Sequence, residues 1–381
     1  MKFLHLADLH LGKRYNELSL IDDQKYILEK ILEIAVKVKP DGIILAGDIY
    51  DKPVPPAEAV ELLNGFLVGL TALKIKVFMI SGNHDSAERI AFGESLMGFG
   101  GVFISPVYDG CVKSVTLNDC FGEVRVYLLP FIKPAAVRRF FGGEKTESYN
   151  DALKAVIGAL DIDKTRRNVL VAHQFVTGSQ SSGSEEFSVG DIGNVDASVF
   201  DGFDYVALGH VHGAQNVCGE RVRYAGTPLK YSLSEAKSVK SATLVELKEK
   251  GSLTVSEIPL TPMREVVEIR GLYDELTKRS FYENTTYAND LVHVVLTDEE
   301  DVPDALGKLR IIYPNIMSLR YDNKRTRGQA ELDLQCDGAI AARSPFGLFS
   351  ALYAAQNNSE MSEGQAEFMR ALIEKVWEDG E

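Results

Sequence analysis

Five short motifs, each at the end of an apolar run, together hold five histidines and several aspartate and asparagine residues. The motifs are ADLHLGK (7–13), AGDIYD (46–51), SGNHDS (81–86), NVLVAH (168–173) and VALGHVHGAQ (206–215). The chain has seven histidines in all, so the motifs hold most of them. Imidazole nitrogens with carboxylate and amide oxygens suit Mn²⁺, Fe²⁺, Zn²⁺ or Mg²⁺ rather than a soft-metal thiolate site.

The spacing within two motifs has a geometric meaning. Asp8 and His10 are separated by one residue, and so are His210 and His212. Residues i and i+2 of an extended segment face the same side, so both members of each pair can reach one ligand. In three of the motifs a glycine directly precedes the first candidate ligand and permits tight turns and close backbone approach; these glycines are Gly47, Gly82 and Gly209.

Each motif alone is a weak signal. A single GD or GNHD occurs in many turns, because aspartate and asparagine are common turn residues. His5 and His293 lie outside the motifs, and we expect them to be structural. The ordered set, by contrast, offers enough ligands for two ions with one bridging carboxylate, and two ions about 3.5–4 Å apart clamp the attacking and leaving oxygens of a phosphoryl displacement.

Strands and helices that alternate along the first part of the chain explain how distant motifs can meet. The runs KFLHLA, DGIILAG, KVFMISG, NVLVAH and DYVALGH are typical of buried strands. Residues 20–39 and 55–73 have helical spacing, the second after prolines at a helix start. This order predicts an α/β sheet, in which ligands bind at the carboxyl ends of the strands.

The pattern divides the chain into four parts. Residues 1–260 hold all the motifs and end in VRYAGTPLKYS, KSATLVELK and SLTVSEIPL, which we expect to be antiparallel strands. Residues 261–325 read as a small α/β unit with strands in REVVEIRG, LVHVVLTD and IMSLRYDN and helices near 273–279 and 303–312. Residues 326–344 read as a polar linker, and residues 345–381 as two helices.

Composition excludes several classes of protein. The 381 residues carry a formal net charge of −14, which argues against a surface that coats nucleic acid unaided. No apolar run approaches the roughly 20 residues that span a bilayer, and Asp8 and His10 interrupt the N-terminal segment where an export signal would stay apolar. Four widely spaced cysteines without a CxxC pair favour reduced thiols. We therefore expect a cytoplasmic protein without membrane contact.

The ordered motifs D-x-H, GD, GNHD, H and GHxH resemble those of the calcineurin-like metallophosphoesterase superfamily. Within it, the chain resembles the SbcD family of bacterial nuclease subunits over nearly its whole length, including LLPFIKPAAVRRFF and RYAGTPLKYSLSEA. The resemblance implies a β-sandwich flanked by helices over residues 1–260 and a small α/β capping domain for DNA recognition over 261–325. Beyond the linker, it implies C-terminal helices over 345–381 that dock an SbcC-type ATPase.

The resemblance also implies roles for individual residues. One divalent ion would be held by Asp8, His10, Asp48 and His212, and the other by Asp48, Asn83, His173 and His210. Mn²⁺ is the expected metal, with Mg²⁺, Fe²⁺ or Zn²⁺ as alternatives. His84 would contact the scissile phosphate and stabilise or protonate the departing oxygen, and Asp85 would orient His84. Asp51 stands where archaeal and eukaryotic relatives have a second histidine, so that histidine's role is not carried over.

The implied activity is metal-assisted hydrolysis of DNA phosphodiesters. It would comprise exonuclease action on duplex ends and endonuclease action on single strands and hairpins, in DNA repair, recombination and replication. Expected DNA contacts are Lys13, Arg14, Arg138 and Arg139. A homodimer is expected through apolar helices near 57–73 and 90–99, although core packing explains these apolar faces equally well. The Gly/Ser-rich loop 177–190 is expected to be mobile and near the site.

Two other functions use the same motifs. A generic metallophosphatase or phosphodiesterase would share every ligand, but serine/threonine phosphatases carry GDxVDRG and GNHE where this chain has GDIYDKP and GNHD. A non-catalytic DNA-end scaffold would use the metals structurally, yet structural sites are usually closed and rich in cysteine. Cleavage of DNA, turnover of a small phosphoester, and binding without cleavage distinguish the three.

Overall fold

The computed structural model describes residues 1–15, 18–141, 146–181, 194–326, 345–357 and 360–378. The chain divides into two compact units, residues 1–268 with 289–292, and residues 269–288 with 293–381. No helix among the described residues is both long and apolar enough to span a membrane.

The first sheet of the larger unit has six strands in the order β14-β13-β1-β4-β5-β6. Strands β1, β4, β5 and β6 run parallel, whereas β13 and β14 are antiparallel to their neighbours. Their bounds are Lys2–Leu6 (β1), Gly42–Ala46 (β4), Lys76–Ile80 (β5), Val102–Ile104 (β6), Ser241–Leu247 (β13) and Leu253–Pro259 (β14). The parallel part confirms the predicted strand–helix–strand order.

The second sheet has the order β11-β12-β10-β9-β8-β7. Its four central strands are parallel, and β7 and β11 are antiparallel at the edges. The bounds are Lys113–Asp119 (β7), Gly122–Leu128 (β8), Arg167–His173 (β9), Tyr205–Gly209 (β10), Gln215–Cys218 (β11) and Val222–Tyr224 (β12). We expected VRYAGTPLKYS to form the first of three consecutive antiparallel strands, and this is wrong. Its strand, β12, pairs in parallel with β10 and does not pair with β13. The hairpin of β7 and β8 was not predicted.

The two sheets pack face to face. Phe3, Ile44 and Phe78 of the first sheet share one buried core with side chains of the second, such as Val171 and Tyr205. Since apolar side chains from the inner faces of both sheets fill this space, the larger unit is the expected β-sandwich.

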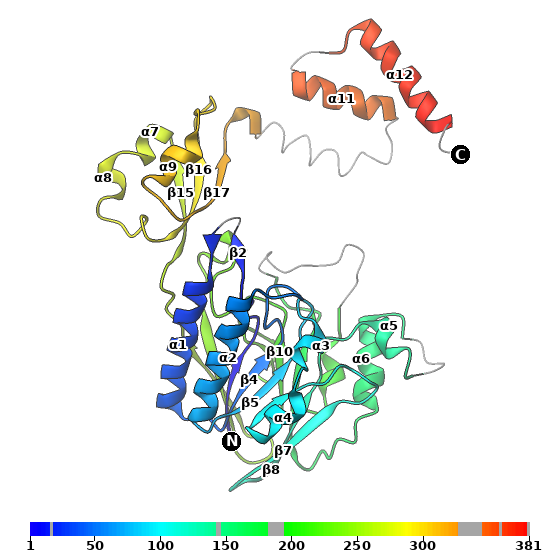
Figure 1. Cartoon of the computed structure of the whole chain (residues 1–381). Coiled ribbons are helices and arrows are strands. Elements are labelled where there is room, and N and C mark those ends of the chain that lie inside the picture. The colour runs from blue at the N-terminus through cyan, green and yellow to red at the C-terminus, as the bar shows by residue number, and fades with distance from the viewer. Residues whose placement is uncertain (16–17, 142–145, 182–193, 327–344, 358–359, 379–381) are drawn as a thin grey trace. The chain divides into compact units, whose positions relative to one another are not determined.

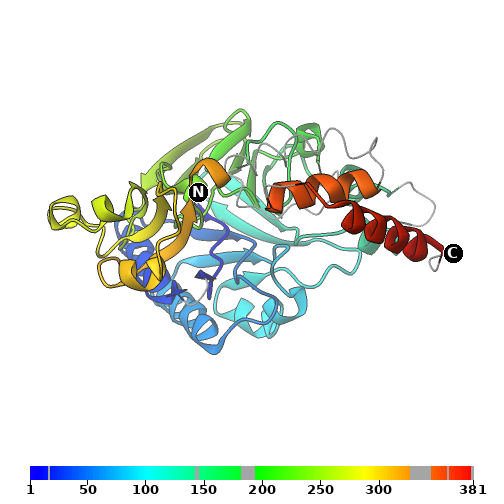
Figure 2. The ribbon, with the colours of Figure 1, turned by 90° about the horizontal axis from the view of Figure 1, so that it is seen from above.

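Helices cover the outer faces of the sandwich. Helices α1 (Ile21–Val38) and α2 (Ala57–Ala72) lie side by side (Figures 1 and 2), and α2 starts after Pro56 as predicted. Helix α6 (Tyr149–Gly158) packs on the second sheet with a core of its own. Shorter elements are β2 (Arg14–Tyr15), β3 (Leu18–Ser19), α3 (Ala87–Ile90), α4 (Glu94–Phe99), α5 (Pro134–Val137), η1 (Ala197–Phe200) and η2 (Leu233–Glu235).

A three-stranded sheet, β15-β16-β17, and several short helices follow along the chain. The strands span Val266–Gly271, Leu291–Leu296 and Ile316–Tyr321, as predicted. The helix expected near 273–279 is two single turns, α7 (Tyr273–Leu276) and α8 (Arg279–Tyr282), and α9 spans Ala305–Arg310. Helices α11 (Pro345–Asn357) and α12 (Glu363–Glu378) form the predicted C-terminal pair. All of the expected linker except Thr326 lies outside the described residues.

Candidate two-metal centre

The five motifs meet at the carboxyl ends of parallel strands from both sheets. Asp8, Asp48 and Asn83 follow β1, β4 and β5, while His173 ends β9 and His210 follows β10. Two hydrogen bonds join the sheets here: His173 Nδ1 donates to the Ala46 carbonyl at 2.9 Å, and the His210 amide donates to Asp8 Oδ1 at 2.9 Å. The predicted convergence is confirmed.

The backbone at these strand ends is strained. Asp8, His10, Asp48 and His210 have φ angles of 54°, 44°, 47° and 102°, a region that costs a non-glycine residue roughly 1–3 kcal/mol. Three other non-glycine residues in the described chain have positive φ, so most of this strain lies at the site. Hydrogen bonds between the turns hold it, including His10 N to the Asp48 carbonyl at 3.0 Å. The strain serves to aim side chains that a regular strand would turn elsewhere.

The three glycines singled out in the sequence allow this close approach. A Cβ on Gly209 would lie 1.9 Å from the Ala46 carbonyl oxygen, and one on Gly82 would lie 2.1 Å from Asp48 Oδ1. Gly47 has a φ of 85°, and its Cβ would lie 2.4 Å from His173 Nδ1. A larger residue at any of these positions would therefore force its neighbours to move.

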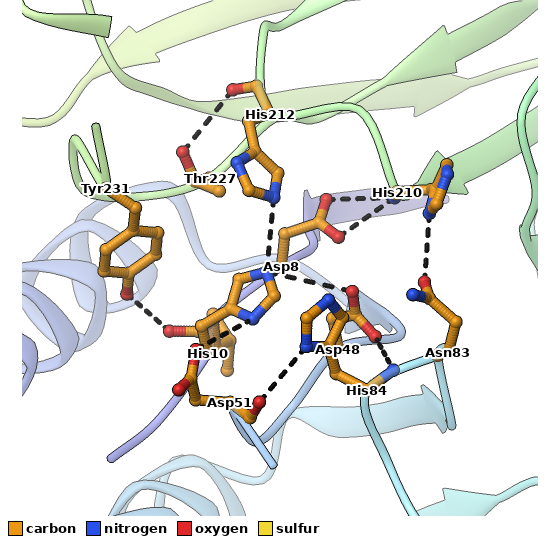
Figure 3. Close-up of polar contacts among 12 residues, drawn as sticks. Asp8, His10, Asp48, Asp51, Asn83, His84, His210, His212, Thr227 and Tyr231 are labelled. Atoms are coloured by element: carbon orange, nitrogen blue, oxygen red, sulfur yellow. Dashed lines mark hydrogen bonds and ion pairs between the residues drawn. The ribbon is translucent and has the colours of Figure 1, made fainter. Parts of the chain in front are cut away.

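The first ligand group surrounds His10 (Figure 3). Its Nε2 lies 3.3 Å from His212 Nε2 and 3.8 Å from Asp48 Oδ2. Asp8, His10 and His212 each present one ligand atom, all within 4.8 Å of one another. This is the first set that the resemblance implied, with its four members brought together.

The second group lies on the other side of Asp48. His173 Nε2 is 3.3 Å from Asp48 Oδ2 and 2.9 Å from Asn83 Oδ1. The same Asn83 oxygen is 3.0 Å from His210 Nδ1. Because one oxygen of Asp48 faces both His10 and His173, this carboxylate is placed to bridge two ions.

The chemistry of these donors fits divalent cations. His10 Nε2 and His212 Nε2 face each other at 3.3 Å, so their lone pairs can bind one cation between them. Asp8 and Asp48 are 0% and 2% exposed, and two carboxylates buried this close call for compensating positive charge. Burial, and secondarily the charge of Asp48, raises the pKa of Asp8 to about 7 despite the opposing effect of His173. A cation would relieve the repulsion between the two acids.

Histidine protonation responds to the same two acids. Burial alone would lower the pKa of His173, but the negative charge of Asp48 raises it to about 9. In turn, His173 holds the pKa of Asp48 well below its usual range in spite of burial. Burial keeps the pKa of His10 well below its ordinary value. The protonation of His173 is therefore linked to the charge of Asp48, and burial favours the neutral form of His10, which can offer a lone pair.

His84 lies beside the first group with its ring edge-on to His10, the ring centres 4.8 Å apart. Its Nδ1 donates to the Asp51 carbonyl at 3.1 Å. The Asp85 carboxylate accepts from the main-chain amides of Ile49, Tyr50 and Gly82 at 3.0, 2.9 and 2.9 Å. It therefore binds the turns that follow β4 and β5 to each other, and the expectation that it orients His84 stays a prediction.

Two side chains that hold the DLHLG turn were not predicted from the sequence. Gln24 of α1 donates to the His10 carbonyl at 2.7 Å and accepts from Gly12 N at 2.9 Å. The Tyr231 hydroxyl donates to the Leu9 carbonyl (Figure 3). Gln24 carried a signal, because it is a polar residue three and four positions before Ile27 and Leu28 on the apolar stripe of α1. Tyr231 carried none beyond its place in RYAGTPLKYSLSEA.

The predicted basic contacts are placed unevenly. Lys13 Nζ lies 2.7 Å from Asp51 Oδ1, and that same oxygen is 3.7 Å from His10 Nδ1, so Lys13 is next to the site. Arg14 begins β2 and is exposed, Arg138 binds the Thr146 carbonyl at 3.1 Å, and Arg139 is exposed. Most of the loop expected beside the site, 177–190, lies outside the described residues.

Comparisons with known proteins agree with this geometry. Residues 1–214 match the family model described as calcineurin-like phosphoesterase, and residues 262–357 match the one described as type 5 capsule protein repressor C-terminal domain. The chain is 33% identical to the D subunit of nuclease SbcCD from Staphylococcus epidermidis over 89% of this chain and 91% of that protein. It is 34% identical to the protein of the same name from Staphylococcus saprophyticus over 84% of each.

A solved structure of a dimetal phosphatase from Danio rerio covers 68% of this chain and 98% of its own, with 13% identity and a TM-score of 0.41. That likeness is too low to bear on function. The family models and the two staphylococcal relatives decide the assignment: the chain belongs to the calcineurin-like phosphoesterases and, among them, to the SbcD family of nuclease subunits.

Proposed function

We propose that this chain is a metal-dependent DNA nuclease that hydrolyses phosphodiester bonds in the cytoplasm. The observation that carries the proposal is the convergence of seven ligand side chains in two groups that share Asp48. Two divalent ions, Mn²⁺ by preference, would when bound generate a hydroxide from water at neutral pH and neutralise charge on the phosphate. Asp8, His10, Asp48 and His212 would hold one ion, and Asp48, Asn83, His173 and His210 the other.

His84 is the residue that we assign to the departing oxygen. A carbonyl oxygen only accepts, so the bond to Asp51 O fixes a proton on His84 Nδ1. Nε2 is then the atom that faces substrate, and in the imidazolium form it donates to the leaving group. Asp85 supports this indirectly, because it holds the turns on either side of Asp48 and His84.

Exonuclease action on duplex ends and endonuclease action on single strands and hairpins are the specific activities that we propose. A chain with a net charge of −14 needs local positive charge to hold DNA. The two ions and Lys13 would supply it at the site, with Arg14, Arg138 and Arg139 as outer contacts. The small unit that we place at 261–325 would act as the capping domain for DNA recognition.

One cleavage experiment tests the function against its alternatives. The purified chain is incubated with labelled duplex and hairpin DNA and with a small phosphoester, with and without Mn²⁺, alongside His84→Ala and Asp48→Ala. Cleavage of both DNAs only with Mn²⁺, lost in both variants, is the expected result. Turnover of the small ester without DNA cleavage would instead make the chain a generic phosphatase, and binding without cleavage would make it a scaffold.

An SbcC-type ATPase is the partner that we propose for residues 345–381. This segment has two basic and seven acidic residues. Apolar side chains on α11 and α12 are exposed, namely Leu352 at 56%, Phe368 at 68% and Leu372 at 42%. A chain truncated after Ser344 should no longer copurify with the ATPase, and recovery of the complex would refute this assignment.

A homodimer through α2 and α4 is also proposed. Core packing does not account for α4, because none of its residues is buried. Phe92, Leu96 and Phe99 are 80%, 76% and 92% exposed, and clustered apolar exposure of this kind is typical of an interface. Leu96→Asp should convert a dimer into a monomer in sedimentation, without loss of folding. A variant that sediments as the wild type would exclude this surface.

A further inference from the structure

A buried pair of opposite charges lies behind His212. Glu235, the last residue of η2, is 2% exposed, and Lys240 is 5% exposed. Their side chains pair through Glu235 Oε2, and Thr227 Oγ1 donates to the same oxygen at 3.1 Å. Thr227 and Glu235 lie within RYAGTPLKYSLSEA, but the sequence pattern assigned no role to them or to Lys240.

The pair contacts both the ring and the main chain of His212. Glu235 Oε1 lies 3.5 Å from His212 Nδ1. Lys240 Nζ donates to the His212 carbonyl at 3.0 Å, and the Thr227 amide donates to it at 3.1 Å. The Thr227 hydroxyl also lies 3.4 Å from this carbonyl oxygen (Figure 3). One network therefore fixes where His212 sits and how its ring is turned.

The ring orientation has a chemical consequence. A carboxylate only accepts, so a ring nitrogen that faces one carries the proton. His212 Nδ1 faces Glu235, which leaves the lone pair on Nε2, the atom 3.3 Å from His10 Nε2 inside the first ligand group. In His173 of the second group, Nδ1 instead donates its hydrogen bond to the neutral carbonyl of Ala46.

We propose that Glu235, held by Lys240, is a positioning residue that fixes the tautomer and orientation of His212 and thereby sets the affinity of the first ion only. The inference rests on the proposed function for the assignment of His212 to that ion. Partners behind a ligating histidine typically change metal affinity by about 10–100-fold. The effect should be confined to the first group, because the second takes no member from this network.

The test is Mn²⁺ binding by the full-length, metal-free chain, without DNA. Glu235→Gln/Lys240→Met removes both charges at nearly constant volume, which avoids leaving one buried charge unpaired. Electron paramagnetic resonance reports free Mn²⁺, single bound ions and exchange-coupled pairs. We expect the first ion to bind about 10–100-fold more weakly and the second to bind as in the wild type, so that single-ion signal replaces pair signal.

Two further variants keep the test decisive. Asp119→Asn/Arg167→Met removes an ion pair at the opposite end of β9 from His173, in which Arg167 is buried and Asp119 partly exposed, and should leave both affinities unchanged. Glu235→Asp keeps the charge but withdraws it by one methylene. It should weaken the first ion relative to the wild type and leave the second unchanged, and it carries the test if the double variant does not fold. Equal weakening of both ions, or of neither, would overturn the positioning role. Two bound ions without DNA cleavage would overturn the proposed function and leave this inference intact.

Discussion

Gly209→Ala is the substitution whose effect the structure defines most sharply. Gly209 ends β10, and a Cβ there would lie 1.9 Å from the Ala46 carbonyl oxygen and 2.8 Å from His173 Nδ1. Since real Cβ atoms are not found closer than 3.0 Å, β10 and the end of β4 must separate by at least 1.1 Å, the difference of 3.0 and 1.9 Å. The Ala46 oxygen that must move is the one that holds His173.

Two magnitudes follow from this displacement. Overpacking of a close-packed interior costs about 1–3 kcal/mol of unfolding free energy. A misplacement of about 1 Å at reacting groups lowers the rate by roughly 10²-fold. Because the displaced carbonyl orients a metal ligand, we expect Gly209→Ala to show both effects, with cleavage reduced more than stability alone explains.

Urea unfolding and Mn²⁺-dependent DNA cleavage measure the two effects separately. Gly65→Ala on α2 is the matched control, because its Cβ meets nothing within 4 Å; it should retain wild-type cleavage and gain roughly 0.5–1 kcal/mol from better helix propensity. If Gly209→Ala cleaves DNA like the wild type and unfolds at the same urea concentration, the close approach of the two sheets does not position the site.

Three other predictions concern the site and the sandwich. His84→Ala should lower cleavage by about 10²–10⁴-fold and keep Mn²⁺ binding, and loss of the metal would show that His84 is a ligand. Mn²⁺ at 100 times its Kd should raise the free energy of unfolding by about 2.7 kcal/mol in thermal melts against EDTA, whereas an unchanged melting temperature would contradict a preformed site. Hydrogen bonds from Arg167 lower the pKa of Asp119, so its stabilisation is complete above the unfolded-state pKa near 3.9 and is lost as pH falls toward the folded value. Asp119→Asn should therefore lower stability by about 1–3 kcal/mol at pH 7, and denaturation should show this gap closing below about pH 4; a gap that does not change with pH would refute the linkage.

The candidate site was predictable because its ligands follow parallel strands. Each strand in KFLHLA, DGIILAG and KVFMISG can be recognised locally, and parallel pairing brings the carboxyl ends together whichever strands are neighbours. The i, i+2 spacing of Asp8 and His10 also anticipated a shared group. Their positive φ angles show, however, that Asp8 and His10 lie in a strained turn and not in a regular strand. The turn sets the direction of both side chains.

Contacts between segments far apart in the sequence were not predictable. Asp85 is adjacent to His84, which suggested that they interact, but did not indicate that its carboxylate accepts from amides 35 and 36 residues away. Strand β12 has only three residues, and so short a segment does not indicate which strand it pairs with. We therefore expected it to begin an antiparallel run. Gln24 and Glu235 reach the site from elements that carry no metal ligand, so only the folded chain reveals them.

Anomalous diffraction from a crystal grown with Mn²⁺ would locate the bound ions themselves. We expect two peaks about 3.5–4 Å apart, with Asp48 bound to both, His10 and His212 on one, and His173 and His210 on the other. A single peak, or peaks away from these strand ends, would contradict it.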